Sequence, residues 1–184
     1  TIVSGAPTAS RDMLVSTPDR HLVLFGTETT IGDTTTQDDM FIRFSSQEDI
    51  TDWAPTAVNT AGTQRLAAGS RIIGSNAAVE VDGAAYWMSD NGFFRFTGKL
   101  ESMDCLVEDY VYDDINITSN QFIYCGINNL FGEVMWFYPT AASNVVDRCV
   151  VYSYLDSTPQ RPIWYTNANS LYPRTTWVDS SVFG

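Results

Sequence analysis

Histidine, serine and cysteine are the residues with which this chain could perform nucleophilic catalysis. The sequence has one histidine, His21, which opens an apolar stretch directly after Asp19 and Arg20. The Gly-x-Ser-x-Gly motif, in which a tight turn presents a reactive serine to a histidine, does not occur. The sequence therefore predicts a structural or surface histidine and no catalytic nucleophile.

Metal and cofactor motifs are also missing from the sequence. The three cysteines, Cys105, Cys125 and Cys149, are odd in number and lie far apart, unlike zinc ligands or a disulfide framework, so we expect free thiols. The chain has no Asp-x-Asp-x-Asp-Gly calcium loop and no glycine-rich loop that leads into a helix to hold phosphate. We expect no catalytic, cofactor-binding or metal-binding residues, and a protein that is not an enzyme.

Carboxylates gather in two stretches of the chain. Two carboxylates could hydrolyse a glycosidic bond, one as acid and the other as base or nucleophile. Because 22 of the 184 residues are acidic, such clusters also arise by chance, and we expect solvated faces, turn residues and helix caps. The residues in question are Glu101, Asp104, Glu108, Asp109, Asp113 and Asp114, and then Asp33, Asp38 and Asp39.

Five tryptophans could stack on sugars, namely Trp53, Trp87, Trp136, Trp164 and Trp177. Trp87 and Trp136 lie among apolar neighbours in expected strands, so we expect them in the core. Trp53 follows an acidic stretch and is expected to anchor a loop. Residues 116–118 (Asn-Ile-Thr) match a glycosylation sequon, but the sequence shows no secretion signal and we expect no use of it.

Composition limits the class of protein. With 44% hydrophobic and 17% charged residues, the chain is not a disordered segment. Its net charge is −12 and Lys99 is its one lysine, which disfavours a protein that wraps nucleic acid. No apolar run approaches the ~18 residues of a membrane helix, so we expect no membrane insertion.

Short apolar stretches bounded by turn residues predict an all-β fold, because β-branched and aromatic residues suit a half-buried pleated surface. Asp82-Gly83 favours a type I′ turn, and 83–96 should form consecutive antiparallel strands. One short helix is expected near 106–115, with Asp104 as its cap, because residues 107, 110, 111 and 115 have helical spacing. The expected strands are 21–25, 40–44, 71–73, 77–81, 84–88, 93–96, 121–126, 133–138, 149–154, 162–166 and 175–178.

Weak self-similarity links three aromatic-rich strands, at 39–45, 83–89 and 132–138. Their spacing of about 44–50 residues is close to the period of β-propeller blades, each a four-stranded meander. A two-sheet sandwich has strands of the same local appearance, and we favour the propeller.

Several longer phrases resemble the β-propeller virion proteins of tailed bacteriophages, in the tail hub, the nozzle or the head–tail connection, with DNA-stabilisation proteins as the nearest group. The resemblance covers most of the chain from about residue 19 onward, and it rests on structural phrases that carry no active-site residues. The phrases are 19–26, 41–49 with 51–53, 77–83 with 86–88 and 91–94, 133–139, 147–152 and 174–179.

The resemblance implies a structural virion subunit that helps to form the DNA exit channel and to retain or pass the genome. Its partners would be other tail or connector proteins and copies of itself in a ring, with DNA passing nearby without sequence-specific binding. The protein would be made in the host cytoplasm and located in the virion. An acidic lumen would keep DNA from sticking, because like charges repel across a Debye length of ~8–10 Å.

The resemblance also implies a further strand pair where Ser75-Asn76 joins two expected strands directly. We therefore expect residues 1–184 to be a single β domain that belongs to a longer propeller chain. We favour the omission of internal residues, which would place Ser75 and Asn76 far apart, because loss of half a blade would leave sheet edges unpaired. A short natural version would instead pair the two flanking strands in one sheet. Two other functions stay open: a propeller glycosidase, or a module that binds host surface glycans or receptors.

Overall fold

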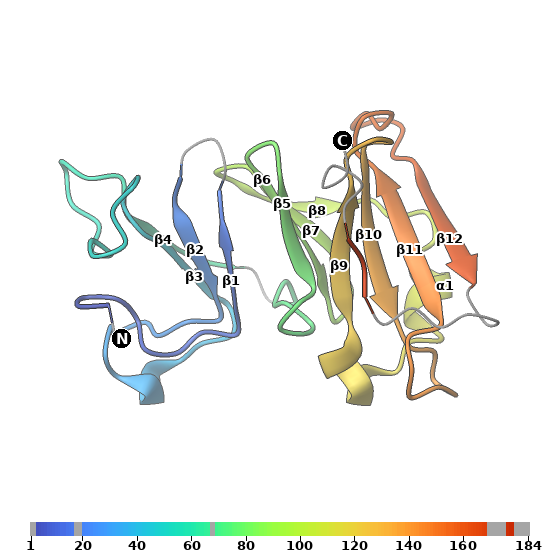
Figure 1. Cartoon of the computed structure of the whole chain (residues 1–184), viewed down its shortest axis with the longest axis horizontal. Helices are drawn as coiled ribbons and strands as arrows, with labels where there is room; N and C mark the ends of the chain where they lie inside the picture. Colours follow the sequence, from blue (N-terminus) through green and yellow to red (C-terminus); the bar gives the residue numbers. More distant parts are fainter. Residues whose placement is uncertain (1–2, 17–19, 67–68, 169–175, 179–184) are drawn as a thin grey trace.

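The structure is a computed structural model that describes residues 3–16, 20–66, 69–168 and 176–178. It is mostly β, with three four-stranded antiparallel sheets, and this confirms the all-β prediction. Figure 1 shows the sheets following one another across the molecule in chain order.

Sheet 1 contains β1 (Asp12–Val15), β2 (Leu22–Phe25), β3 (Phe41–Phe44) and β4 (Gly62–Arg65). Sheet 2 contains β5 (Ala78–Val81), β6 (Ala84–Ser89), β7 (Gly92–Phe96) and β8 (Leu100–Met103). Sheet 3 contains β9 (Tyr124–Asn128), β10 (Glu133–Tyr138), β11 (Arg148–Ser153) and β12 (Trp164–Ala168).

Each sheet is a meander in which every strand pairs with the next strand along the chain. The β5–β6 hairpin turns at Asp82 and Gly83, whose φ angles of 49° and 82° are both positive, as the predicted type I′ turn requires. The pairing of β6 with β5 and β7 confirms that 83–96 forms consecutive antiparallel strands. All six residues of β6 are buried.

The first strands of the three sheets lie next to one another. Strand β5 contacts β1 on one side and β9 on the other. A parallel bridge between Asn76 and Tyr124 extends this contact, with the Cys125 amide donating to the Asn76 carbonyl at 2.7 Å. The first strands of sheets 2 and 3 therefore run in the same direction, side by side.

Aromatic side chains fill the space between the sheets. Trp87, Phe93 and Trp136 are completely buried in a core that extends through all three sheets. This confirms the core positions predicted for Trp87 and Trp136. A smaller cluster that includes Met135 and Phe137 lies on the opposite face of sheet 3, where Trp177 packs against it.

The helix is shorter than predicted. Helix α1 (Glu108–Tyr112) has Val107 at its N-cap, without a side-chain cap, so Asp104 does not cap it. Two 3₁₀ helices, η1 (Thr34–Thr36) and η2 (Ile117–Phe122), complete the helical part of the described residues. No helix among those residues is long and apolar enough to cross a membrane.

Three strand predictions are corrected. Residues 71–73 contribute a single bridge, Ile72 to Ser89, instead of a strand. The strand expected from 121 begins at Tyr124, because η2 occupies the residues before it. Residues 176–178 are not in a strand, and Thr175 lies outside the described residues.

The proposed repeat is right for two of its three segments. Residues 83–89 and 132–138 cover β6 and β10, the second strands of sheets 2 and 3. Residues 39–45 cover β3, the third strand of sheet 1, whose second strand is β2. The repeat therefore matches the third strand of sheet 1 to the second strands of the other two sheets, because the β2–β3 connection in sheet 1 is longer.

The join at Ser75-Asn76 is a turn. The Ala77 amide donates to the Gly74 carbonyl at 3.2 Å, which closes residues 74–77. The two flanking segments do not pair with each other. Both bond to Met88 of β6, the Ile73 amide at its carbonyl (2.9 Å) and the Ala77 carbonyl at its amide (3.1 Å).

Candidate functional site

Two clefts open between neighbouring sheets. The first, of about 480 Å³, lies between sheets 1 and 2 and is lined by residues that include His21, Phe44 and Phe96. The second, of about 380 Å³, lies between sheets 2 and 3 and is called here the Arg95 cleft. Both volumes fall within the ~300–1,000 Å³ typical of ligand pockets.

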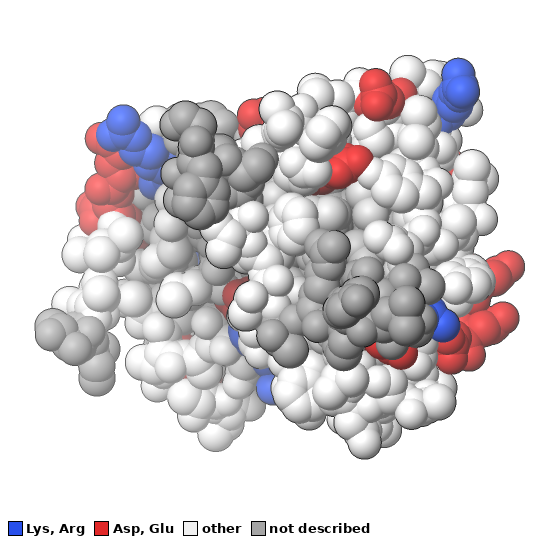
Figure 2. All heavy atoms as spheres, turned by 45° about the vertical axis from the view of Figure 1, so that its right-hand side comes forward, with Lys and Arg blue, Asp and Glu red and all other residues white. Residues whose placement is uncertain are grey.

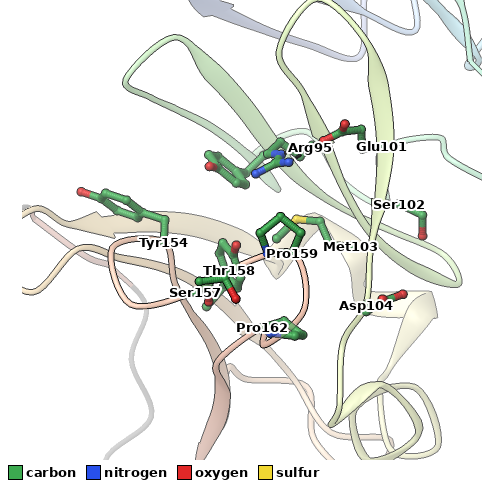
Figure 3. Close-up of a pocket in the computed structure, with 12 residues that line it drawn as sticks. Arg95, Glu101, Ser102, Met103, Asp104, Tyr154, Ser157, Thr158, Pro159 and Pro162 are labelled. Carbon is green, nitrogen blue, oxygen red and sulfur yellow. Dashed lines mark hydrogen bonds and ion pairs between the residues drawn. The ribbon is translucent and has the colours of Figure 1, made fainter.

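The Arg95 cleft has two facing walls (Figure 3). Arg95 of β7 and Glu101 of β8 stand on the sheet 2 side, and the loop between β11 and β12 brings Thr158 and Pro159 to the other. The lining residues are Tyr86, Arg95, Glu101, Ser102, Met103, Asp104, Tyr152, Tyr154, Ser157, Thr158, Pro159 and Pro162.

Arg95 is the central polar group of this cleft. Arg95 and Glu101 are opposite each other in the β7–β8 register, and both the Nε and Nη2 of Arg95 donate to Glu101 Oε2, Nε at 3.2 Å. The guanidinium also bonds to the Tyr86 side chain. The bond from Arg95 lowers the pKa of Glu101 and raises the pKa of Arg95, so both groups are charged at neutral pH.

Two tyrosines from different sheets meet at the inner end of the cleft. The ring centroids of Tyr86 in β6 and Tyr152 in β11 are 6.1 Å apart, and both side chains are buried. Burial raises the pKa of Tyr86, and the neighbouring Tyr152 adds to the effect. The Tyr86 hydroxyl is therefore protonated at neutral pH.

The structure gives His21 a structural role. Its Nδ1 donates to the Ser45 carbonyl at 2.7 Å, and its ring meets Phe44 edge-on at 5.7 Å. These contacts tie the start of β2 to the end of β3, and none of them is with a cysteine or a hydroxyl nucleophile.

The acidic stretches do not form one site. Asp33 caps η1 by accepting from the Thr35 amide at 3.0 Å, and Asp39 pairs with Arg11 and Arg71. Glu108 and Asp109 occupy the first turn of α1. Figure 2 shows acidic side chains at separate places on the visible face, without a continuous patch. These positions agree with the predicted roles as caps, turn residues and solvated groups.

The tryptophans are largely occupied within the protein. Trp53 is buried, and its Nε1 donates to the Ile50 carbonyl at 2.6 Å, which confirms that it anchors a loop. Trp164 is buried too, and its Nε1 donates to the Asp104 carbonyl at 2.8 Å. Trp177 is partly exposed, stacks on Phe137 at 5.8 Å and donates to the Ile127 carbonyl.

The remaining candidates also have internal partners or no ligand arrangement. The Asn116 amide nitrogen donates to the Ser143 carbonyl at 2.9 Å. None of the three cysteines forms a disulfide, and burial raises the pKa of Cys105 to about 12. Across the described part of the chain, no three His, Cys, Asp or Glu residues are grouped so that they could hold a metal ion.

Sequence reasoning missed Arg95 and Thr158 as site residues. The signal for Arg95 and Glu101 was the turn at residues 97–99, which brings them opposite each other across a hairpin. Thr158 had no signal, because its position depends on how sheets 2 and 3 pack. Comparison with known proteins adds no assignment: neither the family models searched nor the curated proteins searched contain a match to this chain.

Proposed function

We propose that the chain is a structural subunit of a bacteriophage particle, in the tail hub, the nozzle or the head–tail junction. There it helps to form the DNA exit channel and to retain or pass the genome. The observation that carries the proposal is the row of three consecutive four-stranded meanders whose first strands lie side by side. The virion-protein resemblance of the sequence connects this architecture to a phage particle.

The meanders support a propeller. A propeller blade is a four-stranded antiparallel sheet, and blades are arranged around a central axis. The contacts of β5 with β1 and β9 give the three sheets a common inner edge, and the Asn76–Tyr124 bridge gives the parallel direction expected of successive blades. A closed propeller of at least about four blades would take further blades from the same polypeptide or from another copy.

Charge supports a channel role without direct DNA binding. The net charge of −12 makes contact with the phosphate backbone unfavourable, because such binding depends on Lys and Arg. In a ring of copies, acidic side chains facing the lumen would repel DNA over ~8–10 Å and let it slide. The partners are then copies of this chain and neighbouring tail or connector proteins, and the protein acts without catalysis.

The test is a reconstruction of the particle whose genome encodes this chain. We expect density for the three sheets in a ring around the channel at the head–tail junction or the tail tip. The proposal is wrong if the chain is absent from purified particles or lies in peripheral fibres. Release of reducing sugars from host polysaccharide by the purified protein would favour the glycosidase instead.

A further inference from the structure

The Arg95 cleft has the features of a ligand site, and the proposed particle role does not use it. It lies between two sheets, so its shape depends on buried packing between Tyr86 and Tyr152. The loop that forms its second wall is fixed by two backbone bonds between Thr158 and Arg161, at 3.0 and 3.1 Å. A site that is ordered before binding loses little conformational entropy when a ligand enters.

Polar groups in the cleft have unused hydrogen-bonding capacity. A guanidinium has five N–H donors, more than Arg95 uses on Glu101 and Tyr86. Both bonds from Arg95 end on Glu101 Oε2, so Oε1 has no partner among the described residues. The Thr158 hydroxyl on the opposite wall likewise has no hydrogen-bond partner among the described residues, and Thr158 is exposed.

These groups indicate the charge and hydrogen-bonding type of the ligand. Arg95 and Glu101 cancel each other's charge, so the cleft has no surplus cation to hold a phosphate. Side by side they offer N–H donors and a carboxylate acceptor, which suits hydroxyl groups that both donate and accept. Met103, Pro159 and the Tyr86 ring supply apolar surface between the polar groups.

We propose that the Arg95 cleft binds a neutral saccharide. The hydroxyls of the sugar would bond to Arg95, Glu101 and Thr158, and its C–H face would pack on Met103 and Pro159. A proline-rich peptide fits less well, because its residues supply carbonyl acceptors but no N–H donor, and Glu101 Oε1 would remain without a partner.

The pairing of Glu101 with Arg95 favours binding over hydrolysis. A glycosidase needs a carboxylic acid that keeps its proton near neutral pH, which requires a raised pKa. The bond from Arg95 lowers the pKa of Glu101 instead. The proposal therefore adds glycan recognition to a particle subunit, and it can fail without affecting the proposed structural role.

Saturation-transfer NMR on the purified chain tests the proposal. The probes are glucose, galactose, mannose, rhamnose and N-acetylglucosamine at about 10 mM, well above a Kd of about 1 mM, with a polyproline peptide and inorganic phosphate as alternatives. We expect transfer to at least one sugar. We expect binding at least about tenfold weaker in Arg95→Met, and several-fold weaker in Thr158→Val.

The matched control is Arg20→Met, which removes the exposed ion pair between Arg20 and Glu48 on sheet 1. This variant should bind sugar like the original chain. Circular dichroism melting shows whether each variant is folded, and Thr158→Val serves if Arg95→Met is not. No transfer to any sugar, equal binding by Arg95→Met, or preference for the peptide or phosphate would overturn the proposal.

Discussion

The two seams between the sheets are built from different side chains. In the seam between sheets 2 and 3, the ring centroid of Phe93 lies 5.0 Å from that of Trp136 and 4.8 Å from that of Trp164. The two tryptophan rings stack with their centroids 6.0 Å apart. In the seam between sheets 1 and 2, Phe25 meets Trp87 edge-on at 5.5 Å. The seam between sheets 2 and 3 therefore buries a cluster of rings, whereas the seam between sheets 1 and 2 has a pair.

The polar contacts across the two seams also favour the seam between sheets 2 and 3. Trp136 Nε1 donates to the Ala77 carbonyl at 3.0 Å, which joins sheet 3 to the start of β5 in a buried position. Between sheets 1 and 2, Arg71 pairs with Asp39 at 3.5 Å and with Asp90, but its side chain is 47% exposed. Water and salt weaken exposed ion pairs, whereas a buried hydrogen bond is costly to break. We infer that the seam between sheets 2 and 3 contributes more to stability.

The largest expected effect is that of Trp136→Ala. The substitution removes a fully buried ring that packs against Phe93 and Trp164, and it removes one of the two donors to the Ala77 carbonyl, which keeps its bond from the Met88 amide. We expect a loss of about 4–5 kcal/mol in the free energy of unfolding, measured by urea denaturation.

Trp136→Phe serves as the control, because it keeps an aromatic ring and removes the N–H donor together with part of the indole volume. Its expected cost is about 2 kcal/mol. If Trp136→Ala cost less than Phe25→Ala in the other seam, the ranking of the two seams would be reversed.

Phe25→Ala tests the seam between sheets 1 and 2. Phe25 is 2% exposed, and Trp87 gives it a single cross-sheet ring contact. We expect a cost of about 3 kcal/mol, at the low end for removal of a buried aromatic ring. Urea denaturation of this variant beside Trp136→Ala compares the seams directly.

Arg71→Met tests the exposed ion pairs of the same seam. Two carboxylates lose a partner, but the exposure of Arg71 limits the expected cost to at most about 1 kcal/mol. The difference from the original chain should disappear near 1 M salt, where the Debye length is about 3 Å. A cost that persists at high salt would mean that Arg71 acts through packing.

The strands differ in how well the sequence predicted them. Inner strands such as β6 and β10 are apolar runs bounded by turn residues, and their positions followed from that pattern. Three edge strands were missed: β4 (Gly-Thr-Gln-Arg) and β8 (Leu-Glu-Ser-Met) lack such a run, and β1 (Asp-Met-Leu-Val) has only a short one. The edge strand β5 was nevertheless predicted, because its apolar residues end at Asp82-Gly83. Local pattern therefore predicts a strand where an apolar run ends at a turn, in inner and edge positions alike.

The Arg95 cleft was beyond sequence reasoning for a related reason. Arg95 and Glu101 face each other through the register of one hairpin, but Thr158 reaches them only because sheets 2 and 3 pack together. That packing depends on tertiary contacts such as Phe93 with Trp164, which are far apart in the sequence. The chemistry of a single strand does not encode them.

The smallest expected effect concerns Asp12 of β1, the strand that contacts β5. Burial raises the pKa of Asp12 to about 6, and Cys125 of β9 is close enough to sense its charge. Since the folded pKa lies above the unfolded value of about 3.9, the folded state binds more protons, and stability falls as pH rises from about 4 to about 6. Asp12 is partly exposed, so we expect this loss to stay below about 1 kcal/mol.

The Asp12→Asn variant should lack this loss of stability and be the more stable form at pH 7, which urea denaturation of both proteins at pH 4 and pH 7 measures. If the two proteins showed the same change between these pH values, the carboxyl would be fully hydrated in the folded state, and β1 would not pack against the first strands of the other sheets as closely as the structure shows.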